Sequence, residues 1–68
     1  MSVRKARKVA VGLINKYYGY LPKVREISLV ERCYGAELRF VHKNREYTYD
    51  GVADVLMVET RFGAELVK

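Results

Sequence analysis

Residues 3–18 carry the pattern that most restricts the fold, because their apolar side chains recur every three or four positions. This spacing predicts a helix with one apolar face, formed by Val3, Ala6, Val9, Ala10, Leu13, Ile14 and Tyr17. Ser2 is a suitable N-cap residue, and Gly19 occupies the position at which helices commonly end. In a domain this small, the apolar face of the helix is needed by the core, so the rest of the chain has to cover it.

A chain of 68 residues forms one domain, which we take as residues 1–68. A domain of this size buries only about 60% of its unfolded surface, and small domains commonly add disulfides, a metal or a partner subunit. Cys33 is the only cysteine and His42 the only histidine, which excludes an internal disulfide and a four-ligand Cys/His zinc site. Half of the residues are apolar. We therefore expect self-association, with a homodimer as the simplest form, and no cofactor.

Residues 24–50 are predicted to form a small antiparallel sheet of two to three strands. Apolar and polar side chains alternate along residues 36–43, and two tyrosines alternate with polar residues along 45–50. Residues 42–45 between them are typical of a hairpin turn. The segment 23–32 is ambiguous, because its alternation favours a strand whereas a short helix beginning at Pro22 also fits.

The C-terminal segment supports two interpretations. Asp50 is a suitable N-cap, and a helical projection separates polar from apolar side chains, which predicts a helix over residues 51–62 with a short extended tail. Several β-branched residues argue against this helix. Residues 30–38 also match residues 58–66 at most positions, and the rival interpretation takes Gly35 and Gly63 as hairpin turns of a β-meander. The favoured fold is α+β, with the helix at 3–18 packed on the sheet at 24–50 and a second helix at 51–62.

Charge is distributed unevenly along the chain. Residues 1–25 contain seven basic and no acidic side chains, whereas residues 26–68 contain six basic and eight acidic ones. The net charge of +5 therefore comes from the first third. Such an asymmetry points to nucleic acid or an anionic membrane surface. The longest apolar stretches are too short to span a bilayer, so we expect no integral membrane association and a cytoplasmic location.

These features predict a small, basic, non-enzymatic protein that binds DNA or RNA through its N-terminal helix with weak sequence specificity. Lysines and arginines on one helix face can neutralise several phosphates at once. An asparagine among them can reach a base edge or a phosphate oxygen, and two tyrosines in the basic third can stack on bases. The predicted nucleic-acid-binding residues are Arg4, Lys5, Arg7, Lys8, Asn15, Lys16, Tyr18, Tyr20, Lys23 and Arg25.

The sequence also supports other interpretations. The basic face can simply be solvated and the tyrosines can pack in the core, which would leave a protein–protein adaptor or a self-assembling structural subunit. Asp54, Glu65 and Lys68 are also similar to the metal-binding core of restriction-type nucleases, in which an Asp precedes a Glu-x-Lys motif. Here one extra residue separates Glu65 from Lys68, which on a strand places them on opposite faces.

Overall fold

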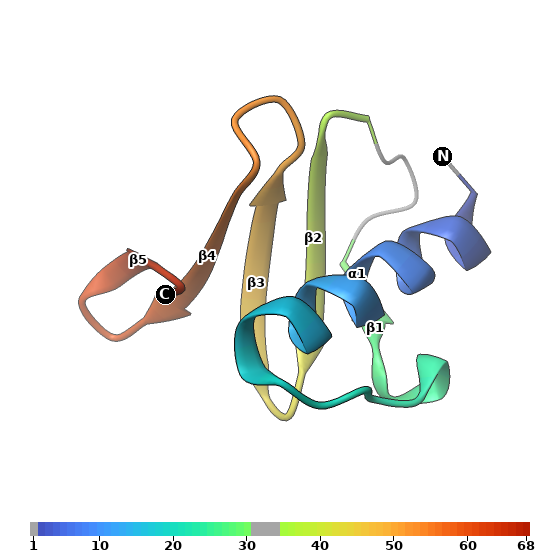
Figure 1. Ribbon diagram of the computed structural model, residues 1–68. Helices are drawn as coiled ribbons and strands as arrows, with labels where there is room; N and C mark the ends of the chain where they lie inside the picture. Colours follow the sequence, from blue (N-terminus) through green and yellow to red (C-terminus); the bar gives the residue numbers. More distant parts are fainter. Residues whose placement is uncertain (1, 31–34) are drawn as a thin grey trace.

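The computed structural model describes residues 2–30 and 35–68, and it confirms the N-terminal helix. Helix α1 comprises Val3–Tyr18 (Figure 1). The hydroxyl oxygen of Ser2 accepts a hydrogen bond from the backbone N–H of Lys5 at 3.2 Å. Gly19 closes the helix in a left-handed conformation, with φ of 78°, and donates its N–H to the carbonyl of Asn15. Both predicted caps are therefore formed.

The remainder of the described chain forms one short 3₁₀ helix and a five-stranded antiparallel sheet, in the order β1-β2-β3-β4-β5. The α+β class is confirmed, but the prediction of two to three strands and a C-terminal helix is wrong. Every strand pairs with its neighbours in sequence, so the sheet is a meander. The elements are η1 (Val24–Glu26), β1 (Ser28–Leu29), β2 (Glu37–His42), β3 (Arg45–Asp50), β4 (Val55–Thr60) and β5 (Gly63–Leu66).

The expected helix at 51–62 is replaced by a turn and strand β4. The Asp50 carboxylate does accept hydrogen bonds from the backbone N–H groups of Val52 and Ala53, as an N-cap residue would. The segment turns only as far as Asp54, whose φ of 54° is left-handed and breaks the helical path. The β-branched side chains that follow favour extended backbone. Leu56 then faces the core, with only 1% of its surface exposed.

Gly63 occupies a hairpin turn, as the rival interpretation predicts. Its φ of 109° lies in a region that L side chains rarely adopt, and it pairs with Thr60 across the turn. The Thr60 hydroxyl donates to the carbonyl of Gly63 at 2.8 Å and accepts from the N–H of Phe62. The matching segment before Gly35 falls on residues 31–34, which include Cys33 and lie outside the described residues.

The ambiguous segment 23–32 contains both of the structures considered for it. Lys23 precedes the single turn of η1, and the extended backbone of β1 follows. Between them Ile27 is buried. The hairpin predicted at residues 42–45 is confirmed, with a two-residue turn between β2 and β3.

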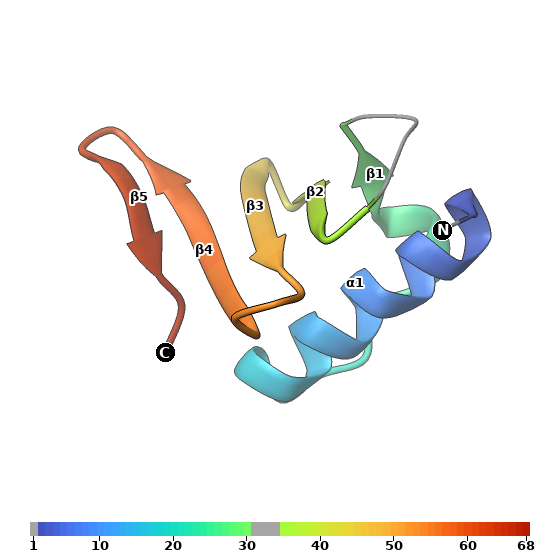
Figure 2. The ribbon, with the colours of Figure 1, turned by 90° about the horizontal axis from the view of Figure 1, so that it is seen from above.

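Helix α1 lies across one face of the sheet beside β1, β2 and β3, whereas the β4–β5 hairpin extends beyond the helix (Figure 2). The core lies between helix and sheet, and its fully buried larger side chains are Ile14, Ile27, Leu38, Phe40 and Leu56. Alternate residues of β2 and β3 supply this face, as predicted from their sequences. Within the described part of the chain, no helix has the length and apolar character needed to cross a membrane.

Candidate nucleic-acid interface

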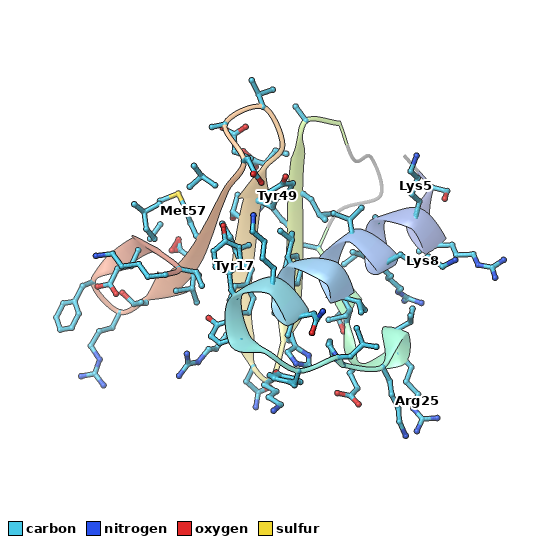
Figure 3. The ribbon with its side chains drawn as sticks, in the orientation of Figure 1. Lys5, Lys8, Tyr17, Arg25, Tyr49 and Met57 are labelled. Atoms are coloured by element: carbon cyan, nitrogen blue, oxygen red, sulfur yellow. The ribbon has the colours of Figure 1, made fainter. Side chains whose placement is uncertain are left out.

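Three predicted cations gather at the N-terminal end of α1. Arg4, Lys5 and Lys8 are exposed, and together with Ser2 they line a shallow hollow. Figure 3 shows Lys5 and Lys8 on the same side of the molecule as Arg25, which belongs to η1 and is also exposed. The structure therefore brings the exposed cations of the first turns of α1 together on one surface, which we call the helix-start patch: Arg4, Lys5 and Lys8.

Among the described residues, no acidic group is paired with the charges of the helix-start patch. The first turn of α1 holds no acidic residue. A cation near a helix N-terminus opposes the helix dipole, at about 0.3–1 kcal/mol for each charge. An anion bound at the patch would relieve this repulsion.

The other predicted residues of the basic set are placed differently. Arg7 is partly buried, and its Nε has no hydrogen-bond partner among the described groups. Asn15 and Lys23 are exposed. Lys16 lies 3.7 Å from the carboxylate of Asp54, so its charge is partly offset.

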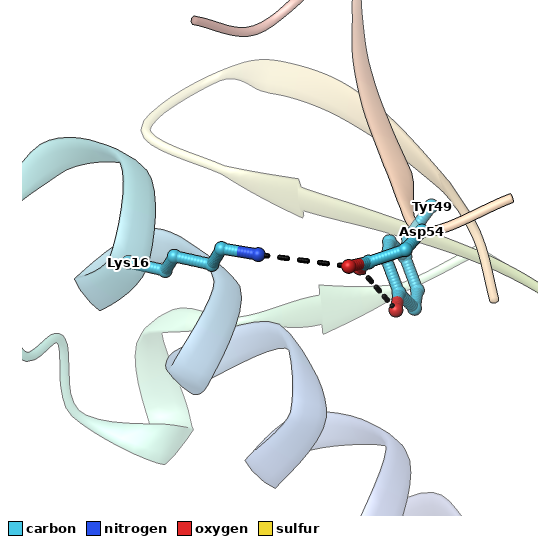
Figure 4. A network of polar contacts seen from close by, with 3 residues as sticks. All are labelled: Lys16, Tyr49 and Asp54. Atoms are coloured by element: carbon cyan, nitrogen blue, oxygen red, sulfur yellow. Dashed lines mark hydrogen bonds and ion pairs between the residues drawn. The ribbon is translucent and has the colours of Figure 1, made fainter.

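Asp54 links Lys16 to the sheet. Its carboxylate also accepts a 2.9 Å hydrogen bond from the hydroxyl of Tyr49 (Figure 4). This hydrogen bond raises the pKa of Tyr49 above its ordinary value, because the phenol must stay protonated to donate it. Lys16 is thus the member of the predicted set that an acidic side chain engages, as judged from the described residues.

The two tyrosines predicted to stack on bases lie at the other end of α1. Tyr18 and Tyr20 line a pocket of about 380 Å³ between the end of the helix and the β2–β3 hairpin. We call it the tyrosine pocket; its other lining residues are His42, Lys43, Arg45 and Tyr47. Sequence reasoning did not find these four residues. The available signal was the pair of cations within the predicted hairpin turn, close to a tyrosine.

His42 fixes the position of Tyr20. The histidine is 2% exposed, and its Nδ1 lies 3.3 Å from the backbone carbonyl of Glu26. In the tautomer that carries the proton on Nδ1, this nitrogen donates to the carbonyl and Nε2 is left as an acceptor. The hydroxyl of Tyr20 lies 2.7 Å from Nε2 and donates to it.

Tyr47 forms the floor of the pocket. Its ring stacks on the buried ring of Phe40 at 5.1 Å and meets Tyr18 edge-on at 6.2 Å. Its hydroxyl lies 3.3 Å from that of Tyr18. Burial, and then the hydrogen bond with Tyr18, raise the pKa of Tyr47 to about 12, while the charge of Arg45 acts in the opposite direction. Tyr47 is therefore a neutral phenol at physiological pH.

The nuclease-like trio has no shared centre in the described structure. Asp54 is engaged by Lys16 and Tyr49, whereas Glu65 lies on β5 in register with Val58. Within residues 2–30 and 35–68, no three His, Cys, Asp or Glu side chains come together in a way that could hold a metal ion.

No protein-family model matches the sequence, no curated protein matches it, and no solved structure matches the fold. The function is therefore inferred from the helix-start patch and the tyrosine pocket.

Proposed function

We propose that the protein is a small, non-enzymatic nucleic-acid-binding module that contacts phosphates through α1 with weak sequence specificity. The observation that supports this proposal is the helix-start patch, whose cations share one exposed surface without acidic partners among the described residues. The three cations of the patch, with Arg25 of η1 as a fourth contact, would each replace a condensed counterion and make binding depend strongly on salt. The partners that fit this chemistry are DNA or RNA, and a cytoplasmic location stays a prediction.

The salt dependence of binding tests the proposal. With about four phosphate contacts, the slope of log K against log salt should be near −3.6 for duplex DNA and near −2.8 for a single strand. The measurement is fluorescence anisotropy of labelled oligonucleotides of several sequences over a range of salt concentrations. An affinity that does not change with salt would refute the proposal.

A charge-matched pair of variants locates the contact. Lys5→Ala combined with Lys8→Ala should weaken binding to all sequences and flatten the duplex slope by about 1.8. Arg61→Ala combined with Lys68→Ala removes the same charge from the end of the chain that lies beyond α1. This control should leave the slope nearly unchanged. Equal effects of the two double variants would show that the net charge, and not the patch, governs binding.

A second candidate function is self-assembly through the β4–β5 hairpin. Strand β5 is exposed at every residue, and large apolar side chains of the hairpin are open to solvent, with Phe62 85% and Leu66 58% exposed. An uncovered sheet edge with such side chains is a common site of association between chains. Sedimentation equilibrium on the wild type and on Leu66→Lys tests this: a homodimer that dissociates in the variant supports it, and a monomeric wild type refutes it.

A further inference from the structure

The tyrosine pocket combines aromatic walls with cations. Its volume of about 380 Å³ falls within the range of small-molecule sites. Three of its six lining residues are tyrosines, two are the cations Lys43 and Arg45, and none is acidic. A pocket of this composition suits a ligand that carries both a planar ring and a negative charge.

The hydroxyl groups of the pocket leave one proton for a ligand. Tyr20 uses its proton in the hydrogen bond to His42. Tyr18 and Tyr47 share a single hydrogen bond, so one of their two phenol protons is not used between them. The described residues offer this proton no other acceptor. Because Tyr18 is 40% exposed, an anionic oxygen that enters the pocket can accept the proton.

Lys43 occupies a backbone position that suits another residue type. Its φ is 50° and that of Asn44 is 63°, so both residues of the β2–β3 turn are left-handed. Asn, Asp and Gly are the usual residues of such a turn, and a lysine there is conformationally unfavourable. Its ammonium nitrogen lies 4.5 Å from the centroid of the Tyr20 ring. The geometry of the turn therefore does not explain why position 43 is a lysine, whereas a role for its positive charge beside the pocket does.

We propose that the tyrosine pocket binds one unpaired nucleotide, with its base against Tyr18 and Tyr20 and its phosphate held by Lys43 and Arg45. This inference rests on the proposed function and adds the form of nucleic acid that the protein prefers. Bases within a duplex are stacked on one another and cannot enter the pocket, whereas those of a single strand can. Loss of one base-stacking tyrosine commonly weakens single-strand binding about tenfold.

The test compares a 10-nucleotide single strand with a duplex of the same length, by fluorescence anisotropy at one salt concentration. Tyr18→Leu and Lys43→Asn should each weaken single-strand binding about fivefold to tenfold and change duplex binding less than twofold. Lys43→Asn relieves the turn, so its melting temperature should equal or exceed that of the wild type, and weaker binding cannot then reflect unfolding. Lys68→Asn is the control for charge, and its effect on either ligand should be small.

The outcomes separate this inference from the proposed function. Suppose that binding depends on salt but is equally strong for the single strand and the duplex, or that Tyr18→Leu does not change it. Either result would refute nucleotide binding in the tyrosine pocket and would leave the proposed phosphate contacts of α1 standing. If neither the single strand nor the duplex binds, both the pocket inference and the proposed function are refuted.

A second titration distinguishes the source of the nucleotide. Uridine 5′-monophosphate is added while backbone amide signals are followed by NMR. Shifts confined to the residues around the pocket, together with single-strand preference, support the inference. If the mononucleotide binds at the pocket but no strand does, the pocket is a site for free nucleotides, and the proposal for a strand is overturned.

Discussion

The hydrogen bond between Tyr20 and His42 makes a quantitative prediction about stability. Tyr20→Phe removes only the hydroxyl that donates to Nε2 of His42, a ring that is 2% exposed. A buried acceptor left without its donor costs about 1–3 kcal/mol. Tyr20 is partly exposed, so water can reach the acceptor from its side, and the cost should be near the lower end of this range. A domain of this length has a free energy of unfolding of roughly 3–10 kcal/mol, so the loss is easily measured.

A double-mutant cycle isolates the interaction. His42→Leu removes the ring and its bond to the Glu26 carbonyl, and the double variant leaves no unpaired nitrogen behind. The double variant should therefore lose about 1 kcal/mol less than the sum of the two single variants. The assay is urea denaturation followed by far-ultraviolet circular dichroism, because the chain contains no tryptophan.

Additivity of the two substitutions to within about 0.5 kcal/mol would refute the reasoning. It would mean that Tyr20 contributes nothing through His42, and that the tyrosine wall of the pocket is not fixed by the histidine. Tyr20→Phe combined with Thr60→Val serves as the control cycle. Thr60 lies at the β4–β5 turn and shares no bond with Tyr20, so these two effects should add.

Two further predictions concern charge and pH. The pKa of Tyr47 is raised from 10.0 to about 12, so its phenol ionises at a lower pH in the unfolded chain than in the folded one. The contribution of Tyr47 to stability is therefore fully present below pH 10 and is lost as the pH rises towards 12. The loss is at most about 2 kcal/mol because water at the pocket screens part of it, and Tyr47→Phe should remove it in thermal melts at pH 9–12. Asp54→Asn frees Lys16 and should steepen the salt slope of nucleic-acid binding by about 0.7–0.9. Glu59→Gln makes the same change of charge on the far side of the sheet, so an equal effect would contradict the role of Lys16.

The sequence correctly predicted those structures that depend on residues close together along the chain. The cap at Ser2, the apolar spacing of α1 and the glycine at its end all point to the same helix, and the structure contains it. The prediction of a helix after Asp50 was wrong because the first turn of this segment is common to a helix and a hairpin. The choice between them depends on the pairing of Leu56 with Tyr49 in the neighbouring strand, which no local pattern of the sequence shows.

The same distinction applies to the candidate site, where the sequence predicts the cations of α1 but not the tyrosine pocket. The exposed cations of α1 follow from helical periodicity, so the sequence identifies them. The tyrosine pocket is formed by contact between residues far apart in the chain, such as Tyr20 and His42, which are 22 positions apart. Composition could suggest Tyr18 and Tyr20, but only the path of the β2–β3 hairpin brings Lys43 and Arg45 beside them.

The residue at position 5 shows whether stability or binding explains the charge of α1. Lys5 is the third residue of the helix after its cap Ser2, where an acidic side chain would complete a capping box and favour the helix dipole. Lys5→Glu should therefore raise the free energy of unfolding by about 1 kcal/mol, while the reversed charge weakens nucleic-acid binding more than Lys5→Ala does. Urea denaturation and anisotropy on the same samples measure both effects. A variant that is more stable and still binds normally would show that the lysine has no role in recognition, and a less stable variant would show that its position in the helix has been misjudged.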